Sequence, residues 1–259
     1  MSALLLAATV GLAADADLPD GNRLVRELAG KQRHWEEVIN SYTYDVAVVR
    51  EDLDKDGKVT KREVRGFEVF YVKGRPVRRQ VSEDGRPLSP DRQAKVDRDV
   101  KEKVEDITAG RVATERPRVA LSAILERYDF RAVKRETLDS GPAIVLEFTP
   151  RPGSRPLDHD NVLRVLAGQM WVDEAEREVV RAEIRNTEGV KYLGGVGASV
   201  SEVSALLEFR RVGDALWLPV RDETRASGRV MLFKSFRTRI VRTYDNFRRF
   251  EVQSEEKVH

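Results

Sequence analysis

Four carboxylates recur at the spacing of a calcium-binding loop. Asp52, Asp54 and Asp56 stand at positions 1, 3 and 5 of a short acidic stretch, Gly57 follows at position 6, and Glu63 closes it at position 12. Calcium takes several oxygen ligands around a sharp turn, and this spacing supplies them. An EF-hand also needs a helix on each side, whereas the residues flanking this stretch alternate with the period of strands. We therefore expect an ordinary hairpin turn, with calcium binding by Asp52, Asp54, Asp56 and Glu63 as the alternative.

Other catalytic or metal-binding patterns are not evident in the sequence. The chain has no cysteine, which excludes thiol catalysis, Cys-ligated zinc and a disulfide scaffold, and its three histidines lack metal-ligand spacing. It has no Gly-x-Ser-x-Gly elbow, and nothing selects one catalytic pair among 44 acidic residues. We predict that the protein is not an enzyme and needs no cofactor, with calcium as the stated alternative. A hydrolase with a buried carboxylate pair stays open as a third hypothesis.

Charge is abundant but evenly mixed. Lys and Arg number 46 and Asp and Glu number 44, so the net charge is only +2. A nucleic-acid-binding protein usually concentrates a basic excess. The interleaved signs favour a solvated mixed surface, and we predict no nucleic-acid partner.

Large aromatic side chains offer a better candidate for a binding surface. They are spread over nearly every segment with strand periodicity, so they form either a filled core or the partly open concave face of a curved sheet. Such an apolar concavity would accept an acyl chain. The candidate cavity residues are Trp35, Tyr44, Phe67, Tyr71, Phe148, Trp171, Phe209 and Phe236.

Strands and a few amphipathic helices must position these side chains. Apolar spacing predicts a helix over residues 21–40 and a charged helix over 90–108, for which Ser89 is the N-cap and Pro90 the first residue. Most of the remaining chain alternates apolar and polar residues between short polar turns. That pattern indicates a mainly β, α+β protein with an antiparallel meander.

The N-terminus has the pattern of an export signal. Residues 3–13 form a short uncharged apolar run that ends in small residues and turns polar at Asp15. A bilayer-spanning helix needs about 20 apolar residues, so this run is too short to be one. We predict a signal peptide over residues 1–16, a mature chain over 17–259 without a transmembrane segment, and a periplasmic location.

Several strand motifs together resemble one known family. They are Tyr128-Asp129-Phe130, residues 145–150, Met170-Trp171-Val172-Asp173, residues 180–184 and Leu216-Trp217-Leu218-Pro219. The chain thereby resembles the periplasmic outer-membrane lipoprotein-sorting superfamily of LolA/LolB type, in particular its longer members. The resemblance implies a single domain over 17–259 with a strongly curved antiparallel sheet. This sheet would form an incomplete barrel with amphipathic helices on its concave side and a charged helical insertion near 89–108.

The resemblance also implies a function. Members of that superfamily hold lipoprotein acyl chains in an apolar interior, so we expect a periplasmic carrier whose partner is a lipid, an acyl chain or an acylated protein. The alternative is an envelope signalling or protein-interaction domain that binds a protein partner and carries no lipid.

Overall fold

A computed structural model of the chain describes residues 18–111, 127–153, 163–192, 197–213, 216–230 and 234–249. The predicted signal peptide, residues 1–16, lies outside this part of the chain. The side chains of residues 32–37, Trp35 among them, are also outside the description.

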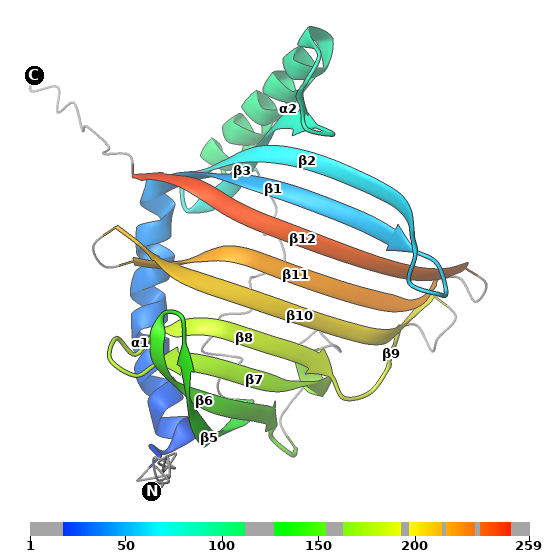
Figure 1. Ribbon diagram of the computed structural model, residues 1–259. Helices are drawn as coiled ribbons and strands as arrows, with labels where there is room; N and C mark the ends of the chain where they lie inside the picture. The colour runs from blue at the N-terminus through cyan, green and yellow to red at the C-terminus, as the bar shows by residue number, and fades with distance from the viewer. Residues whose placement is uncertain are drawn as a thin grey trace, which may run out of the picture.

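One large antiparallel sheet dominates the structure (Figure 1). Its order is β4-β3-β2-β1-β12-β11-β10-β8-β7-β6-β5, and β9 pairs separately with β10. The strands are β1 (Tyr42–Leu53), β2 (Val59–Val72), β3 (Arg75–Glu83), β4 (Arg86–Pro87), β5 (Tyr128–Leu138), β6 (Gly141–Pro150), β7 (Leu166–Asp173), β8 (Val179–Asn186), β9 (Val190–Tyr192), β10 (Ala198–Val212), β11 (Leu216–Val230) and β12 (Lys234–Arg249). Because β4 and β5 stand at opposite edges, the curved sheet is not closed. The predicted mainly β fold with an incomplete barrel is confirmed.

The register of the strands defines two faces of the sheet. Leu146 pairs with Met170, Met170 with Ala182, and Ala182 with Leu207, so these four side chains share one face across β6, β7, β8 and β10. We call this the inner face, because the first helix packs on it. The opposite side of the sheet is the outer face.

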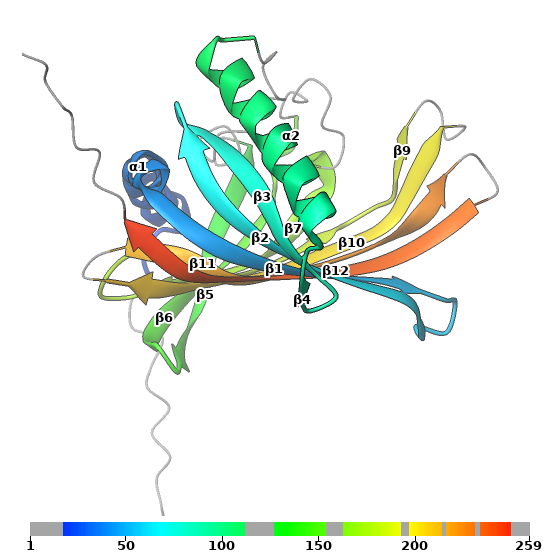
Figure 2. The same cartoon turned by 90° about the horizontal axis from the view of Figure 1, so that it is seen from above.

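Helix α1 (Gly21–Val38) crosses the inner face at one end of the strands (Figures 1 and 2). Its start is capped by Asp20, whose side chain accepts a hydrogen bond from the Arg23 backbone N–H at 2.6 Å. Leu24, Val25 and Leu28 lie on one side of the helix and are buried. They pack against Tyr128, Phe130, Ile144, Leu146 and Val172 of the sheet, and we call these eight residues the α1 core. The predicted first helix is confirmed, and a 3-10 turn, Ile39–Ser41, leads from it into β1.

Helix α2 (Pro90–Thr108) begins after Ser89, as predicted, and lies along β3 (Figure 2). Arg79 of β3 donates both to Glu68 of the neighbouring strand and to Asp97 of α2, the latter at 2.8 Å. Glu68 is next to the inner-face residue Val69 on β2, and Arg79 is next to Arg78, the partner of Val69 on β3. Glu68 and Arg79 therefore point to the outer face, and α2 packs on that face. The two helices therefore pack on opposite faces of the sheet, so the prediction that both cover the concave side applies to one of them at most. The sequence pattern shows that α2 is amphipathic, but not which face of its neighbouring strand it covers.

Candidate functional site

The inner face carries a set of apolar side chains that the α1 core does not include. Val48, Phe67, Leu207, Phe236 and Ile240 come from β1, β2, β10 and β12, and each is only partly buried. The α1 core joins that helix to β5, β6 and β7, at the other end of the strand order. These five residues form what we call the inner apolar surface.

A group of aromatic rings borders the inner apolar surface. The centroid of Tyr44 lies 6.5 Å from that of Tyr71, 6.2 Å from that of Tyr244 and 5.3 Å from that of Phe247. We call these four residues the tyrosine cluster. Such spacing is typical of aromatic pairs that stabilise one another beyond their burial. The cluster therefore provides a preorganised rim with hydroxyl groups beside apolar rings.

The hydroxyl groups of Tyr44 and Tyr244 stay protonated at any physiological pH. Burial raises the pKa of Tyr44, and the hydrogen bond to Tyr71 adds to that effect. Burial also raises the pKa of Tyr244, whose hydroxyl donates to Asp222 at 2.5 Å. Arg242 donates to the same carboxylate at 2.7 Å. Each carboxylate oxygen of Asp222 thus accepts a hydrogen bond from a neighbour on its own face.

The predicted cavity residues do not form a single group. Tyr44, Phe67, Tyr71, Phe148 and Phe236 lie on the inner face by strand register. Phe148 belongs to the α1 end, where its ring contacts Tyr128 and Phe130 at centroid distances of 5.7 and 6.0 Å. Phe209 is two residues after the inner-face residue Leu207 on β10. It pairs with Pro219 of β11, just after a register shift between Glu208 and Phe209. The backbone of Trp35 is in α1, while its side chain is outside the described residues.

Trp171 lies on the outer face, apart from the other candidates. It pairs with Val145 and Arg181, it packs in a second buried cluster with Ala143, Val145 and Val180, and the Arg181 guanidinium stands 5.1 Å from its ring centroid. Alternation within β7 separates Trp171 from Met170, but the sequence does not reveal which of the two points to the inner side.

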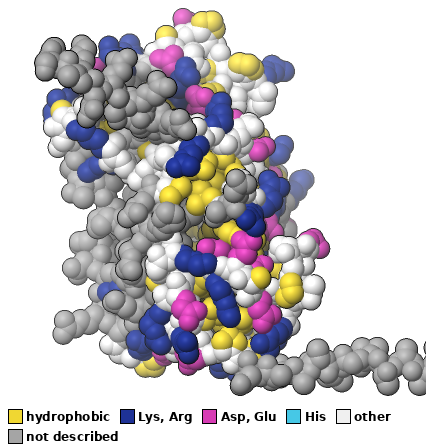
Figure 3. Space-filling view, turned by 90° about the vertical axis from the view of Figure 1, so that its left-hand side faces the viewer, with side chains coloured by type: hydrophobic (Ala, Val, Ile, Leu, Met, Phe, Trp, Pro, Cys, Tyr) yellow, Lys and Arg dark blue, Asp and Glu magenta, His cyan; other side chains and the backbone are white. Residues whose placement is uncertain are grey.

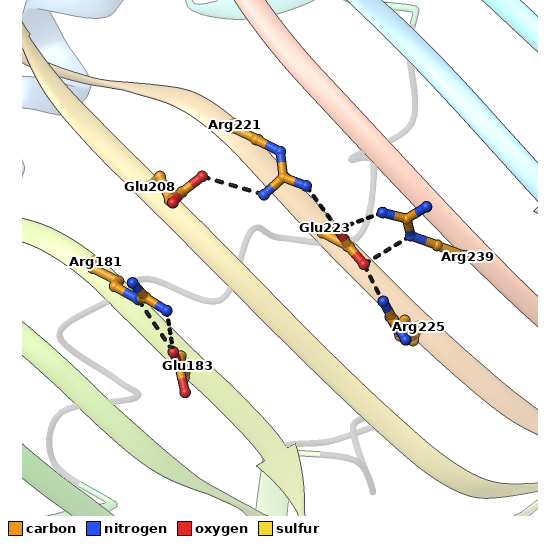
Figure 4. Close-up of polar contacts among 7 residues, drawn as sticks. All are labelled: Arg181, Glu183, Glu208, Arg221, Glu223, Arg225 and Arg239. Carbon is orange, nitrogen blue, oxygen red and sulfur yellow. Dashed lines mark hydrogen bonds and ion pairs between the residues drawn. The ribbon is translucent and has the colours of Figure 1, made fainter.

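The outer face carries an ionic network that the sequence analysis did not single out (Figure 4). Glu223 of β11 accepts hydrogen bonds from Arg221, Arg225 and Arg239, at 2.7 to 2.9 Å. These bonds, led by the one from Arg239, lower the pKa of Glu223 to about 2. The sequence signal was the alternation of arginine and glutamate at every second residue over 181–185 and 221–225.

A cavity of about 930 Å³ lies at this network. A second cavity, of about 460 Å³, shares Arg185, Ser204 and Arg225 with the first. The charged side chains that line the larger cavity include Glu183, Arg185, Arg221, Glu223 and Arg225. The outer face therefore offers hollows lined in part by charged side chains, whereas the inner apolar surface offers aliphatic and aromatic contacts.

Hydrophobic patches also reach the surface at the end of the molecule where α1 crosses the sheet. Figure 3 shows them between side chains of Lys, Arg, Asp and Glu. This mixed pattern agrees with the interleaved charges of the sequence.

The acidic loop joins β1 and β2 as a hairpin, which confirms the favoured prediction. Asp54 accepts hydrogen bonds from the backbone N–H groups of Asp56 and Lys58, both at 2.9 Å, and Gly57 has a φ of +82°. Glu63 lies on β2 and pairs with Lys61 and Arg65, and this pairing, led by Lys61, lowers its pKa. Within the described ranges, no group of three or more His, Cys, Asp or Glu side chains is arranged to hold a metal ion. The predicted ligands thus serve the turn and neighbouring cations.

No helix within the described portion of the chain has the length and apolar character needed to cross a membrane.

Comparison with known proteins gives distant structural matches. No family model matches the sequence, and no curated protein matches it. A domain assigned as an outer membrane lipoprotein-sorting protein from Vibrio parahaemolyticus shares 10% identity at a TM-score of 0.38, over 91% of this chain and 94% of its own. A LolA superfamily protein from Nitrosomonas europaea shares 11% identity at a TM-score of 0.32, over 91% and 96%.

The solved structures similar to this chain include members of the LolA superfamily. The resemblance predicted from the strand motifs is confirmed in that sense. The MucA/MucB complex of Pseudomonas aeruginosa also matches, with 12% identity and a TM-score of 0.25 over 87% of this chain and 99% of the matched one. Similarity at this distance carries no argument about function, which has to come from the two faces of the sheet.

Proposed function

We propose that the protein binds and carries a lipid, an acyl chain or an acylated protein on its inner apolar surface. The observation that supports this most directly is that Val48, Phe67, Leu207, Phe236 and Ile240 are partly buried on one face, outside the α1 core. Partly buried apolar side chains that share one face gain free energy when an apolar ligand removes them from water.

The energy available on such a surface is sufficient for reversible binding. Each methylene group that leaves water contributes about 0.8 kcal/mol. An acyl chain that buries on the order of a dozen methylenes therefore offsets the cost of immobilisation and still reaches micromolar affinity. Reversible binding of that strength suits a carrier, which has to release its cargo.

We place this activity in the periplasm, through the export signal proposed for residues 1–16, and we assign the protein no catalytic role. Tyr44 and Tyr244 of the inner face are protonated, and Asp222 beside Tyr244 is paired with Arg242. These groups are suited to positioning a ligand rather than to proton transfer near neutral pH.

Native mass spectrometry and a transfer assay test the proposal. The purified protein is expected to retain bound lipid in the mass spectrum and to accelerate movement of a fluorescent fatty acid between vesicle populations. A protein that is lipid-free after mild purification and leaves the transfer rate unchanged would contradict the proposal.

Matched variants separate the inner face from the rest of the molecule. Phe67→Asp and Phe236→Asp put a charge on the inner apolar surface and are expected to reduce fatty-acid binding at least tenfold. Val59→Asp is the control, because Val59 is 44% exposed at the start of β2. Equal losses in all three variants would show that binding does not depend on the inner face.

The alternative function is a protein-interaction domain of envelope signalling, and the charged hollows of the outer face favour it. A polar partner segment would exchange ion pairs with the network around Glu223. Under this alternative, Glu183→Lys and Arg185→Glu would abolish capture of an envelope protein while the inner-face variants would not. Lipid retention and transfer would then be absent.

A further inference from the structure

The inner face presents one cation beside the tyrosine cluster without a carboxylate partner. Arg78 of β3 pairs with Val69, which pairs with Tyr44, so its side chain is on the inner face in the row that leads to the cluster. Arg78 is exposed, and within the described residues no hydrogen bond or ion pair is formed by its guanidinium.

Neighbouring inner-face arginines differ from Arg78 in this respect. Arg50 pairs with Asp52 at 3.3 Å and Arg65 pairs with Glu63 at 3.0 Å. The inner-face carboxylate of β11, Asp222, is occupied by Arg242 and Tyr244, as described above. Arg50, Arg65 and Arg242 are thus paired with carboxylates of the same face, whereas Arg78 is left able to bind an anion from solution.

The surroundings of Arg78 combine hydroxyl groups with apolar side chains. Its positive charge lowers the pKa of both Tyr44 and Tyr244, which opposes the larger rise in pKa caused by burial. Those hydroxyls nevertheless remain protonated. On β2, Val69 lies opposite Arg78, and Phe67 and Tyr71 are the flanking residues on the same face. An anion held at Arg78 would therefore lie directly beside the inner apolar surface.

We propose that Arg78 and the tyrosine cluster bind the carboxylate of a long-chain fatty acid whose tail lies on the inner apolar surface. This inference rests on the proposed lipid-binding function and names its ligand class. The planar guanidinium fork of Arg78 matches a carboxylate in a bidentate geometry. The apolar residues beyond it match an unbranched tail.

The test compares an acidic probe with its neutral counterpart. Dansyl-undecanoic acid and its methyl ester share the same tail and fluorophore, and both are titrated into the full chain and into Arg78→Gln. The acid is expected to bind Arg78→Gln about tenfold more weakly, as expected for loss of one charge-assisted pair, and the ester about equally to both proteins. Arg78→Lys keeps the charge without the fork and is expected to give an intermediate loss for the acid alone.

Arg65→Gln is the matched control, because it removes another cation from the same face. It is expected to leave the affinity of both probes within about twofold of the unaltered protein. Circular dichroism and urea unfolding of each variant verify that the fold is retained.

Several outcomes would overturn the inference. It fails if Arg78→Gln weakens the acid and the ester equally, or weakens neither. It also fails if a lysophospholipid displaces the acid at lower concentration than a fatty acid of the same chain length does, since that result would assign the site to a phosphate headgroup. In these cases the unaltered protein still binds the ester, and the proposed function stands. If the unaltered protein binds neither probe, the proposed function fails together with the inference.

Discussion

Glu223 of β11 and Arg239 of β12 form a bidentate ion pair on the outer face (Figure 4). Arg239 Nε donates to one carboxylate oxygen at 2.8 Å, and Arg239 Nη2 donates to the other at 2.9 Å. The Glu223 side chain is 11% exposed. A charge-assisted pair with this geometry is stronger than an exposed one. We predict that Glu223→Gln lowers the free energy of unfolding by about 2 kcal/mol, measured by urea denaturation. Glu183→Gln is the control, because the Glu183–Arg181 pair is largely exposed and is expected to contribute less than about 0.5 kcal/mol.

The same carboxylate predicts a pH dependence of stability. Its pKa falls from the ordinary 4.5 to about 2 in the folded chain. The unfolded chain therefore binds the proton first as the pH falls, so the stabilisation is complete above 4.5 and is lost as the pH drops through 2. The difference in unfolding free energy between the unaltered protein and Glu223→Gln is expected to be constant above about pH 5.5 and to shrink below pH 4.5. A difference that does not change with pH would show that Glu223 has the same pKa in the folded and the unfolded chain.

Burial of the α1 core leads to a second stability prediction. Leu24 is 2% exposed and packs against sheet residues. Leu24→Ala removes these contacts and leaves a cavity, so the unfolding free energy is expected to drop by about 3 kcal/mol. Arg26→Ala, at an exposed position of the same helix, is the control and is expected to change it by less than about 0.5 kcal/mol. Comparable effects of both substitutions would argue against docking of α1 on the sheet.

The sequence predicted the elements of this fold well, because period and turn chemistry are local properties. The apolar spacing of residues 21–40 and the Ser89-Pro90 cap each located a helix to within a few residues. The conflict between the acidic spacing at Asp52 and the strand periodicity around it was decided correctly in favour of a hairpin.

The sequence could not assign side chains to the two faces of the sheet. Alternation within β7 shows that Trp171 and Gln169 share a face. Only the pairing of Trp171 with Val145 and Arg181 shows that this face is the outer one. The placement of α2 depends on the contact between Arg79 and Asp97, which are 18 residues apart on different elements. The network around Glu223 likewise joins strands whose pairing has no local signature. Long-range register therefore decides most of the candidate site.

Two glycines are expected to respond in opposite directions to substitution by alanine. A Cβ at Gly168 of β7 would collide with the backbone carbonyl of Glu183 on β8. Gly168→Ala is therefore expected to separate the two strands and lower the melting temperature by several degrees. A Cβ at Gly30 of α1 meets nothing within 4 Å, so Gly30→Ala is expected to stabilise the protein by about 1 kcal/mol through helix propensity. Thermal unfolding of both variants checks the close β7–β8 approach and the exposed side of α1 together.

Calcium is expected to leave the thermal stability of the protein unchanged. Asp54 holds the hairpin backbone through Asp56 and Lys58, and Glu63 is tied to Lys61 and Arg65, so a metal would have to replace existing interactions. The melting temperature should be the same in millimolar calcium and in EGTA. Asp54→Ala is expected to cost about 1 kcal/mol in either condition, because two backbone hydrogen bonds are lost. A calcium-dependent rise in melting temperature that Asp54→Ala removes would restore the metal-binding alternative.

The separation of Trp171 from the inner-face aromatics makes a final prediction about binding. Trp171 is buried on the outer face under the Arg181 guanidinium, whereas Phe67 is partly exposed on the inner face. Trp171→Phe removes the indole and part of the packing, so it is expected to lower the unfolding free energy by about 1–2 kcal/mol. Because that side chain does not reach the inner apolar surface, fatty-acid affinity should stay within about twofold. Phe67→Ala is expected to lower the unfolding free energy less and to weaken fatty-acid binding more than Trp171→Phe does. The reason is that a partly exposed ring contributes less to folding and more to a ligand lying against it. If Trp171→Phe weakened fatty-acid binding more than Phe67→Ala did, the acyl chain would have to be assigned to the outer face, with its charged cavity.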